Sequence, residues 1–109
     1  KSWAKQNSRE LVAFIRGYRE ALNWLYDPAN KQAALDLFVG KVKGATAQSA
    51  ATSYEVLLNP KTGFTRDAKI SEVGTRTVLA LREKFGQPAK KMQSLDAYYD
   101  PAWYIEASR

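Results

Sequence analysis

The residue types that most often carry out catalysis are either absent from this sequence or scattered along it. The 109 residues include no histidine and no cysteine, which removes the commonest general base and the commonest nucleophile–base pairs. Zinc, copper and iron sites draw on the same two residues. The carboxylates form no Asp-x-Asp loop of the calcium-binding type, and their spacing indicates no catalytic pair of the kind that glycosidases use. We therefore predict that the chain is not an enzyme, with no catalytic residue, no metal site and no cofactor.

Two further motifs have structural interpretations. The run from Gly40 to Gly44 (Gly-Lys-Val-Lys-Gly) lacks the Gly-Lys-Ser/Thr ending of a phosphate loop and follows no strand, so we interpret it as a linker between helices. Asp27 and Asp100 each precede a proline. An aspartate followed by proline suits the N-cap and first position of a helix, so both are predicted to be caps.

The last part of the chain is rich in aromatic residues, with Tyr98, Tyr99, Trp103 and Tyr104 in seven positions. Such a cluster can stack against a base or a planar ligand. Tyr99 and Trp103 are four residues apart, however, which places them on one face of a helix. We favour a terminal helix that docks its aromatic face into a core.

The formal charge of +6 permits binding to nucleic acid or to an anionic surface without requiring it. A helix-turn-helix is one interpretation, with the helix after Thr46 as the recognition helix and Gln48, Ser49 and Thr52 at the bases. No Lys or Arg occurs between Lys43 and Lys61, although such helices contact phosphates as well as bases. The positive residues are otherwise dispersed, so no nucleic-acid partner is expected.

Apolar residues recur at three- and four-residue steps and predict about five helices without a sheet. The first begins at an Asn7 cap with the stripe Leu11, Phe14, Ile15, Tyr18, Leu22 and Leu25, and the second runs over Pro28–Val39, burying Ala33, Ala34, Leu37 and Phe38. The third follows Thr46 with the stripe Ala47, Ala50, Ala51, Tyr54, Leu57 and Leu58. The fourth follows Ser71 with Ile70, Gly74, Val78, Leu81 and Phe85 on one side and stops at Gly86, and the last covers Pro101–Ser108. Phe64, in the loop before the fourth helix, is expected to fill the core.

The length and composition fit one unit. Hydrophobic residues make up 45% and charged residues 26% of the chain, which is typical of a globular protein. The prediction is therefore an all-α chain that forms a single helical domain, or a fragment of one, over residues 1–109. No apolar run approaches the roughly 20 residues that span a membrane.

The order of several short motifs resembles a known family. The motifs are Leu11-Val12-Ala13-Phe14-Ile15-Arg16-Gly17-Tyr18, Trp24-Leu25-Tyr26-Asp27-Pro28-Ala29-Asn30, Ala33-Ala34, Gly63-Phe64, Asp67-Ala68-Lys69-Ile70, Val78-Leu79-Ala80-Leu81-Arg82, Phe85-Gly86 and Tyr98-Tyr99-Asp100-Pro101-Ala102-Trp103-Tyr104. Over essentially the whole chain, they resemble the C-terminal part of substrate-binding proteins of ABC importers. The most similar group is the type that binds nitrate, sulfonates, taurine or thiamine precursors.

The resemblance implies a longer periplasmic protein with a type II α/β fold, in which two lobes close on a solute and deliver it to a membrane permease. This chain would supply C-terminal helices that pack on the lobes. The sequence has none of the strands of that fold and begins near Trp3, so we assign no ligand-binding residue and leave the solute open. The apolar faces that normally cover a sheet would then pair with each other or with a second copy, which predicts self-association. The alternative is a free-standing helical interaction or DNA-binding domain.

Overall fold

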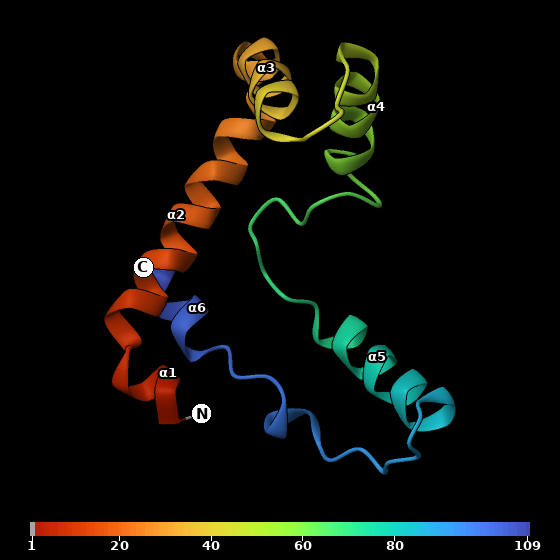
Figure 1. Ribbon diagram of the computed structural model, residues 1–109. Helices are drawn as coiled ribbons and strands as arrows, with labels where there is room; N and C mark the ends of the chain where they lie inside the picture. The colour runs from red at the N-terminus through yellow and green to blue at the C-terminus, as the bar shows by residue number, and fades with distance from the viewer. Residues whose placement is uncertain (1) are drawn as a thin grey trace. The chain divides into compact units, whose positions relative to one another are not determined.

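The computed structural model describes residues 2–109, and all regular structure in that range is helical. The α-helices are α1 (Ser2–Gln6), α2 (Ser8–Tyr26), α3 (Lys31–Lys41), α4 (Ala47–Leu57), α5 (Glu72–Phe85) and α6 (Ala102–Ala107) (Figure 1). Two 3₁₀ turns are η1 (Pro28–Asn30) and η2 (Leu95–Ala97). No strand occurs within residues 2–109, so the predicted all-α class is confirmed for that range, with α1 added to the expected helices.

The structure divides into two compact units, and the boundary between them falls inside α2. The central unit is Phe14–Ala68 and contains the rest of α2, then η1, α3 and α4. The terminal unit combines residues 2–13 with Lys69–Arg109 and contains α1, the start of α2, α5, η2 and α6.

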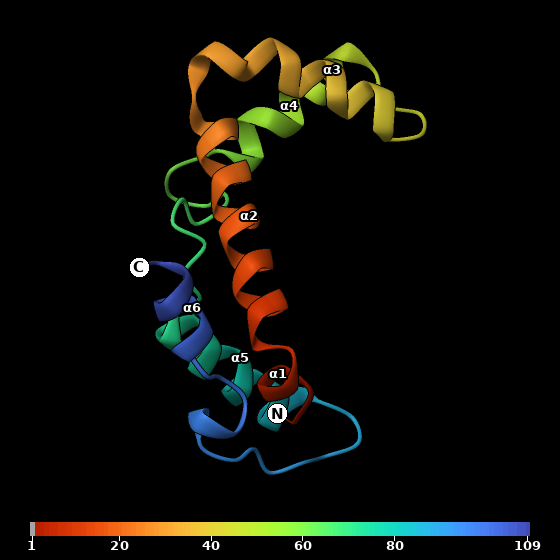
Figure 2. The same cartoon turned by 90° about the vertical axis from the view of Figure 1, so that its left-hand side faces the viewer.

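In the central unit, a capped corner connects α2 to α3. The Asp27 carboxylate accepts a hydrogen bond from the backbone N–H of Ala29 at 2.9 Å, as predicted for a cap, and the chain changes direction there (Figure 2). The expected single helix over Pro28–Val39 is instead a 3₁₀ turn followed by α3, because Asp27 closes a tight Asx-type turn. The predicted break over Gly40–Gly44 is confirmed from Val42 onward, whereas Gly40 and Lys41 still belong to α3.

Helices α3 and α4 lie side by side and form the main packing contact of the central unit (Figure 1). The buried residues at this pair are small, with Ala34 at 8% exposure and Ala50 at 1%. Short side chains allow two helix backbones to approach closely, and Ala50 belongs to the stripe that was predicted for the helix after Thr46. Of the other residues expected to be buried in α3, Phe38 is half-buried, whereas Ala33 and Leu37 are exposed.

The terminal unit is organised around Leu95, Val12 and Ala107, which are its buried apolar residues. Ser71 caps α5 by accepting from the N–H of Gly74 at 3.1 Å, and α5 ends at Gly86, both as predicted. The prediction that Asn7 caps the first helix is wrong. Its side-chain amide donates to the Trp3 carbonyl at 2.8 Å, because the chain enters α2 from the additional helix α1.

The last helix is shorter than expected, over Ala102–Ala107 rather than Pro101–Ser108. The Asp100 carboxylate accepts from the N–H of Ala102 at 3.0 Å, but the N-cap of α6 is Pro101, so Asp100 lies one residue before the cap position that was predicted for it.

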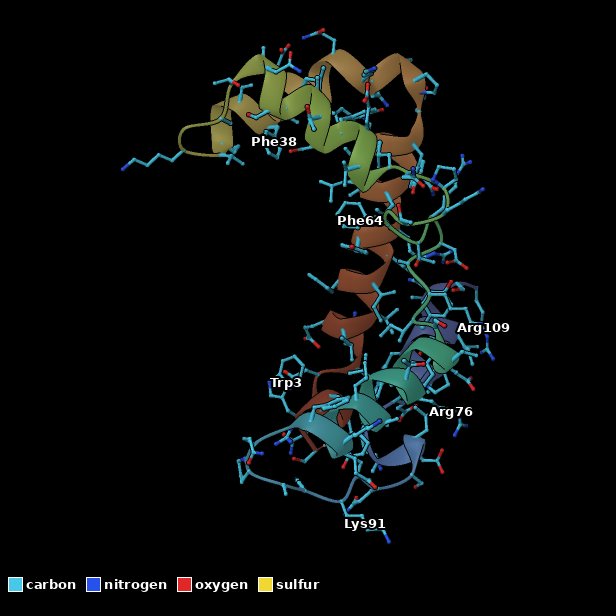
Figure 3. The ribbon with its side chains drawn as sticks, turned by 90° about the vertical axis from the view of Figure 1, so that its right-hand side faces the viewer. Trp3, Phe38, Phe64, Arg76, Lys91 and Arg109 are labelled. Atoms are coloured by element: carbon cyan, nitrogen blue, oxygen red, sulfur yellow. The ribbon has the colours of Figure 1, made fainter. Side chains whose placement is uncertain are left out.

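Many large apolar side chains are exposed within the described residues. Large side chains predicted to be buried are exposed instead, including Phe14 at 69% and Phe64 at 38%. The expectation that Phe64 fills the core is therefore wrong; its backbone carbonyl is held by the Tyr26 hydroxyl at 2.6 Å, and Figure 3 shows its side chain beside α2.

Candidate functional site

A polar hollow lies in the central unit between α2 and the loop that follows α4. It has a volume of about 420 Å³ and is lined by Arg19, Asn23, Thr65, Arg66 and Asp67. The loop side is positioned by Tyr26, whose hydroxyl donates to the Phe64 carbonyl at 2.6 Å. The Arg66 guanidinium carbon lies 5.3 Å from the centre of the Tyr26 ring, so a cation–π contact orders it.

This hollow offers hydrogen-bonding groups of several kinds. Guanidinium, amide, hydroxyl and carboxylate groups line it and can hold a polar solute. No thiol or imidazole is available to act as nucleophile or base, because the sequence has neither Cys nor His. Sequence reasoning did not identify this group, since Arg19 and Arg66 are far apart in the sequence and neither belongs to a recognisable motif.

A second groove lies in the terminal unit between α5 and the segment from Met92 to Leu95. It has a volume of about 620 Å³, and Arg76, Leu79, Ala80, Glu83 and Lys84 line its α5 side. The Glu83 carboxylate accepts from the N–H of Met92 at 2.8 Å, so its role here is to hold the segment against α5. Figure 3 shows the neighbouring Lys91 side chain pointing away from the ribbon.

The polar residues that would read bases from α4 are partly engaged within their own helix. Ser49 is engaged in a capping box with Thr46, in which each backbone N–H is bonded by the other residue's hydroxyl, at 2.9 and 3.1 Å. The Thr52 hydroxyl donates to the Gln48 carbonyl at 3.1 Å. Two of the three predicted base-reading side chains are therefore used inside their own helix.

The aromatic tail is docked within the terminal unit. The Trp103 indole N–H donates to the Ser8 hydroxyl at 3.2 Å, across 95 positions of sequence. Tyr99, Trp103 and Tyr104 are half-buried, and Ala107 is 5% exposed. The Tyr98 hydroxyl accepts from the N–H of Gln93 at 3.3 Å. The interpretation as a docked terminal helix agrees with these contacts better than an open stacking platform does.

Residues 2–109 contain no cluster of three or more Asp and Glu side chains placed to hold a metal ion. Within the same range, none of the helices combines the length and apolarity required to cross a bilayer.

The most extensive unassigned feature is apolar surface on α2 and α5. On α2, Phe14 and Tyr18 stack with ring centres 6.5 Å apart, and both are exposed. On α5, Val73, Val78, Leu81 and Phe85 are each more than half exposed. Exposed apolar surface of this extent is typical of a face that contacts another polypeptide.

The chain was compared with protein families, curated proteins and solved structures. No family model, curated protein or solved structure matches the chain.

Proposed function

We propose that this chain is the C-terminal helical portion of a periplasmic solute-binding protein that serves an ABC importer. Its role would be structural, since its helices would pack on the two α/β lobes that close around the solute. The proposal begins from the ordered motifs between Leu11 and Tyr104, which resemble that family. The solute and the permease are then partners of the intact protein.

The observation that carries the proposal is the uncovered stripe of α2. Phe14 is 69% exposed and Tyr18 is 44% exposed, and they stack four residues apart on one face. Leu25, eleven residues after Phe14, continues that face but is half-buried, so the uncovered part is at Phe14 and Tyr18. Burying such residues is worth about 1.5–3 kcal/mol per large side chain, so the stripe favours a covering partner. A sheet face of an α/β lobe, which helices normally cover, is a partner of the required apolar character.

The absence of His and Cys from the sequence is compatible with this role. A solute receptor binds and releases its ligand without breaking a covalent bond. Under this proposal, the polar hollow at Arg19 and Arg66 lies on the surface of a helical segment and is not the main solute cleft. The resemblance implies that most residues of that cleft come from loops earlier in the intact protein.

The proposal is tested by co-expressing this chain with the polypeptide encoded immediately upstream of it in the reading frame. We expect the two to co-purify and Phe14→Glu to abolish the complex, because a carboxylate would be buried against an apolar lobe. Ala13→Glu is the matched control, since Ala13 is exposed and lies away from the stripe. An upstream frame without alternating strand and helix patterns, or a complex unaffected by Phe14→Glu, would overturn the proposal.

A further inference from the structure

The outer face of α5 carries larger apolar residues than the face that packs within the terminal unit. Leu79 and Ala80 line the groove over Leu95. The opposite side presents an apolar row, with these exposed fractions: Ile70 58%, Val73 75%, Val78 63%, Leu81 52% and Phe85 66%. Gly74 lies in the middle of this row by helical spacing. The helix therefore leaves its wider apolar stripe, which we call the α5 outer face, without a partner.

We propose that the α5 outer face binds a second copy of this chain in an antiparallel, two-fold symmetric helix pair. The spacing of large and small residues along the face carries the inference. We place the two-fold axis at the level along α5 that lies midway between residues 79 and 80, on the side of the outer face. Phe85 of each copy then lies opposite Gly74 of the other, and Leu81 lies opposite Val78. Each large residue thus meets a smaller one, and the same patch serves on both copies, as a two-fold interface requires.

Gly74 provides the space that this pairing needs. It lies in the first turn of α5, and a Cβ added there would meet Ser71 only at 3.4 Å, an ordinary contact. The local structure of α5 therefore does not require a glycine at this position. The missing side chain leaves a gap on the face beside Val78, one turn further along the helix, and this gap can receive the ring of a facing Phe85.

Charge does not oppose the pairing. The Lys84 ammonium lies 5.1 Å from the centre of its neighbouring Phe85 ring, at the edge of the face. In the antiparallel arrangement it approaches Thr77 and Val73 of the other copy rather than a like charge. The Arg82 guanidinium donates to the Pro88 carbonyl at 3.3 Å, which holds that charge within its own copy.

The length of α5 limits the area that the pair can bury. A standard interface takes about 800 Å² from each partner. Because α5 is 14 residues long, or about 21 Å, the pair forms a small interface. We therefore expect a weak dimer that dissociates on dilution.

Sedimentation equilibrium of the 109-residue chain tests this inference. We expect the wild-type chain to dimerise with rising concentration, and Leu81→Glu to weaken dimerisation at least about tenfold. Gly74→Met separates the proposed pairing from nonspecific association. The added side chain fills the space for the facing Phe85 and should weaken the proposed dimer. Because it also adds apolar surface, it would strengthen a nonspecific association. Gly17→Met in α2, which has open space around it, is the matched control and should leave the dimer unchanged.

Cysteine cross-linking tests the orientation, since the chain has no cysteine of its own. A mixture of Val78→Cys and Leu81→Cys chains should cross-link faster than either alone, because these two positions face each other across the axis. A strict monomer at high concentration, stronger association of Gly74→Met, or equal cross-linking in all three samples would overturn the inference. Those outcomes concern α5, whereas the receptor proposal is tested through Phe14 of α2, so either can fail alone.

Discussion

The Tyr54 hydroxyl donates a hydrogen bond to the backbone carbonyl of Leu25 at 2.9 Å. Leu25 lies in the last turn of α2, where carbonyl groups lack a partner within the helix. Tyr54 belongs to α4 and is half-buried. One side chain therefore satisfies the end of α2 and fixes α4 against it within the central unit. The Lys31 ammonium, 5.5 Å from the centre of the Tyr54 ring, extends this contact to α3.

Replacement of Tyr54 by Phe should destabilise the central unit by about 1 kcal/mol, because it removes the hydroxyl and leaves the half-buried Leu25 carbonyl without that donor. Urea denaturation followed by circular dichroism would measure the change in the free energy of unfolding. Tyr18→Phe is the control, since Tyr18 is 44% exposed, and it should change stability by less than about 0.5 kcal/mol. Equal effects of the two substitutions would contradict the assigned role of Tyr54.

Gly63 should tolerate no side chain. Its N–H donates to the Asn59 carbonyl at 2.8 Å, and an added Cβ would meet the Leu57 carbonyl oxygen and, at 2.7 Å, the Asn59 nitrogen. Both neighbours are backbone atoms of the same turn, so they cannot move aside without breaking it. We expect Gly63→Ala to lower the unfolding free energy by more than about 2 kcal/mol.

Gly40→Ala is the matched control for that substitution. Gly40 lies inside α3 with nothing within 4 Å of an added Cβ, so the change should stabilise the chain by about 0.5–1 kcal/mol through helix propensity. Thermal unfolding of both variants in one buffer would give opposite shifts of Tm. Shifts of the same sign would show that the turn at Gly63 is looser than described.

The bond between Trp103 and Ser8 should couple α6 to the start of α2. The indole N–H lies 3.2 Å from the Ser8 hydroxyl oxygen, and Trp103 is half-buried. Trp103→Phe and Ser8→Ala should each destabilise the terminal unit. A double-mutant cycle should give a coupling of about 0.5–1.5 kcal/mol. Trp3→Phe, at a residue 63% exposed, should have almost no effect, and purely additive effects at Trp103 and Ser8 would exclude the coupling.

Helix ends in this chain can be predicted from sequence because capping is local chemistry. Asp27, Thr46, Ser71 and Asp100 each bond a backbone N–H two or three residues ahead. Short polar side chains at such positions have few competing partners. Asn7 is the exception, because α1 places the Trp3 carbonyl within reach of its amide. A capping residue therefore does not mark the start of a helix when a neighbouring turn offers its side chain another hydrogen-bond partner.

Burial could not be predicted in the same way, because periodicity shows only that a face is apolar. The stripe of α2 contains Leu22 at 2% exposure and Phe14 at 69%, although both occupy the same face. On α5 the expected core residues Val78, Leu81 and Phe85 are exposed, and Leu79 faces Leu95 instead. Which stripe is covered depends on contacts between distant segments. The polar hollow at Arg19 and Arg66 was missed for the same reason.

The helix-turn-helix interpretation predicts an outcome that differs from ours. If α4 read DNA, Gln48→Ala would weaken binding to a preferred duplex. We expect no sequence-dependent binding, because residues 44–60 contain no Lys or Arg and Thr52 is bonded within α4. With a formal charge of +6, any mobility shift of random duplex at low salt should vanish steeply as salt rises. Salt-resistant binding that Gln48→Ala abolishes would favour the DNA-binding alternative.

The capping box of α4 should contribute measurably to the stability of the central unit. The Thr46 hydroxyl accepts from the Ser49 N–H at 3.1 Å, and the Ser49 hydroxyl accepts from the Thr46 N–H at 2.9 Å. These bonds satisfy N–H groups at the start of the helix. Thr46→Ala should therefore cost about 1 kcal/mol, whereas Thr46→Asn, which retains a side-chain oxygen as acceptor, should recover most of that loss.

Hydrogen exchange at the first turn of α4 distinguishes this cap from a general loss of packing. Loss of the cap should speed exchange of the Ser49 amide in Thr46→Ala, while the amides near Ala34, in the buried contact of α3 with α4, should keep their rates relative to global unfolding. Because Thr46 itself is exposed, its replacement leaves no cavity in that contact. Uniformly faster exchange across α3 and α4 would show instead that the Thr46 side chain supports the helix pair as a whole.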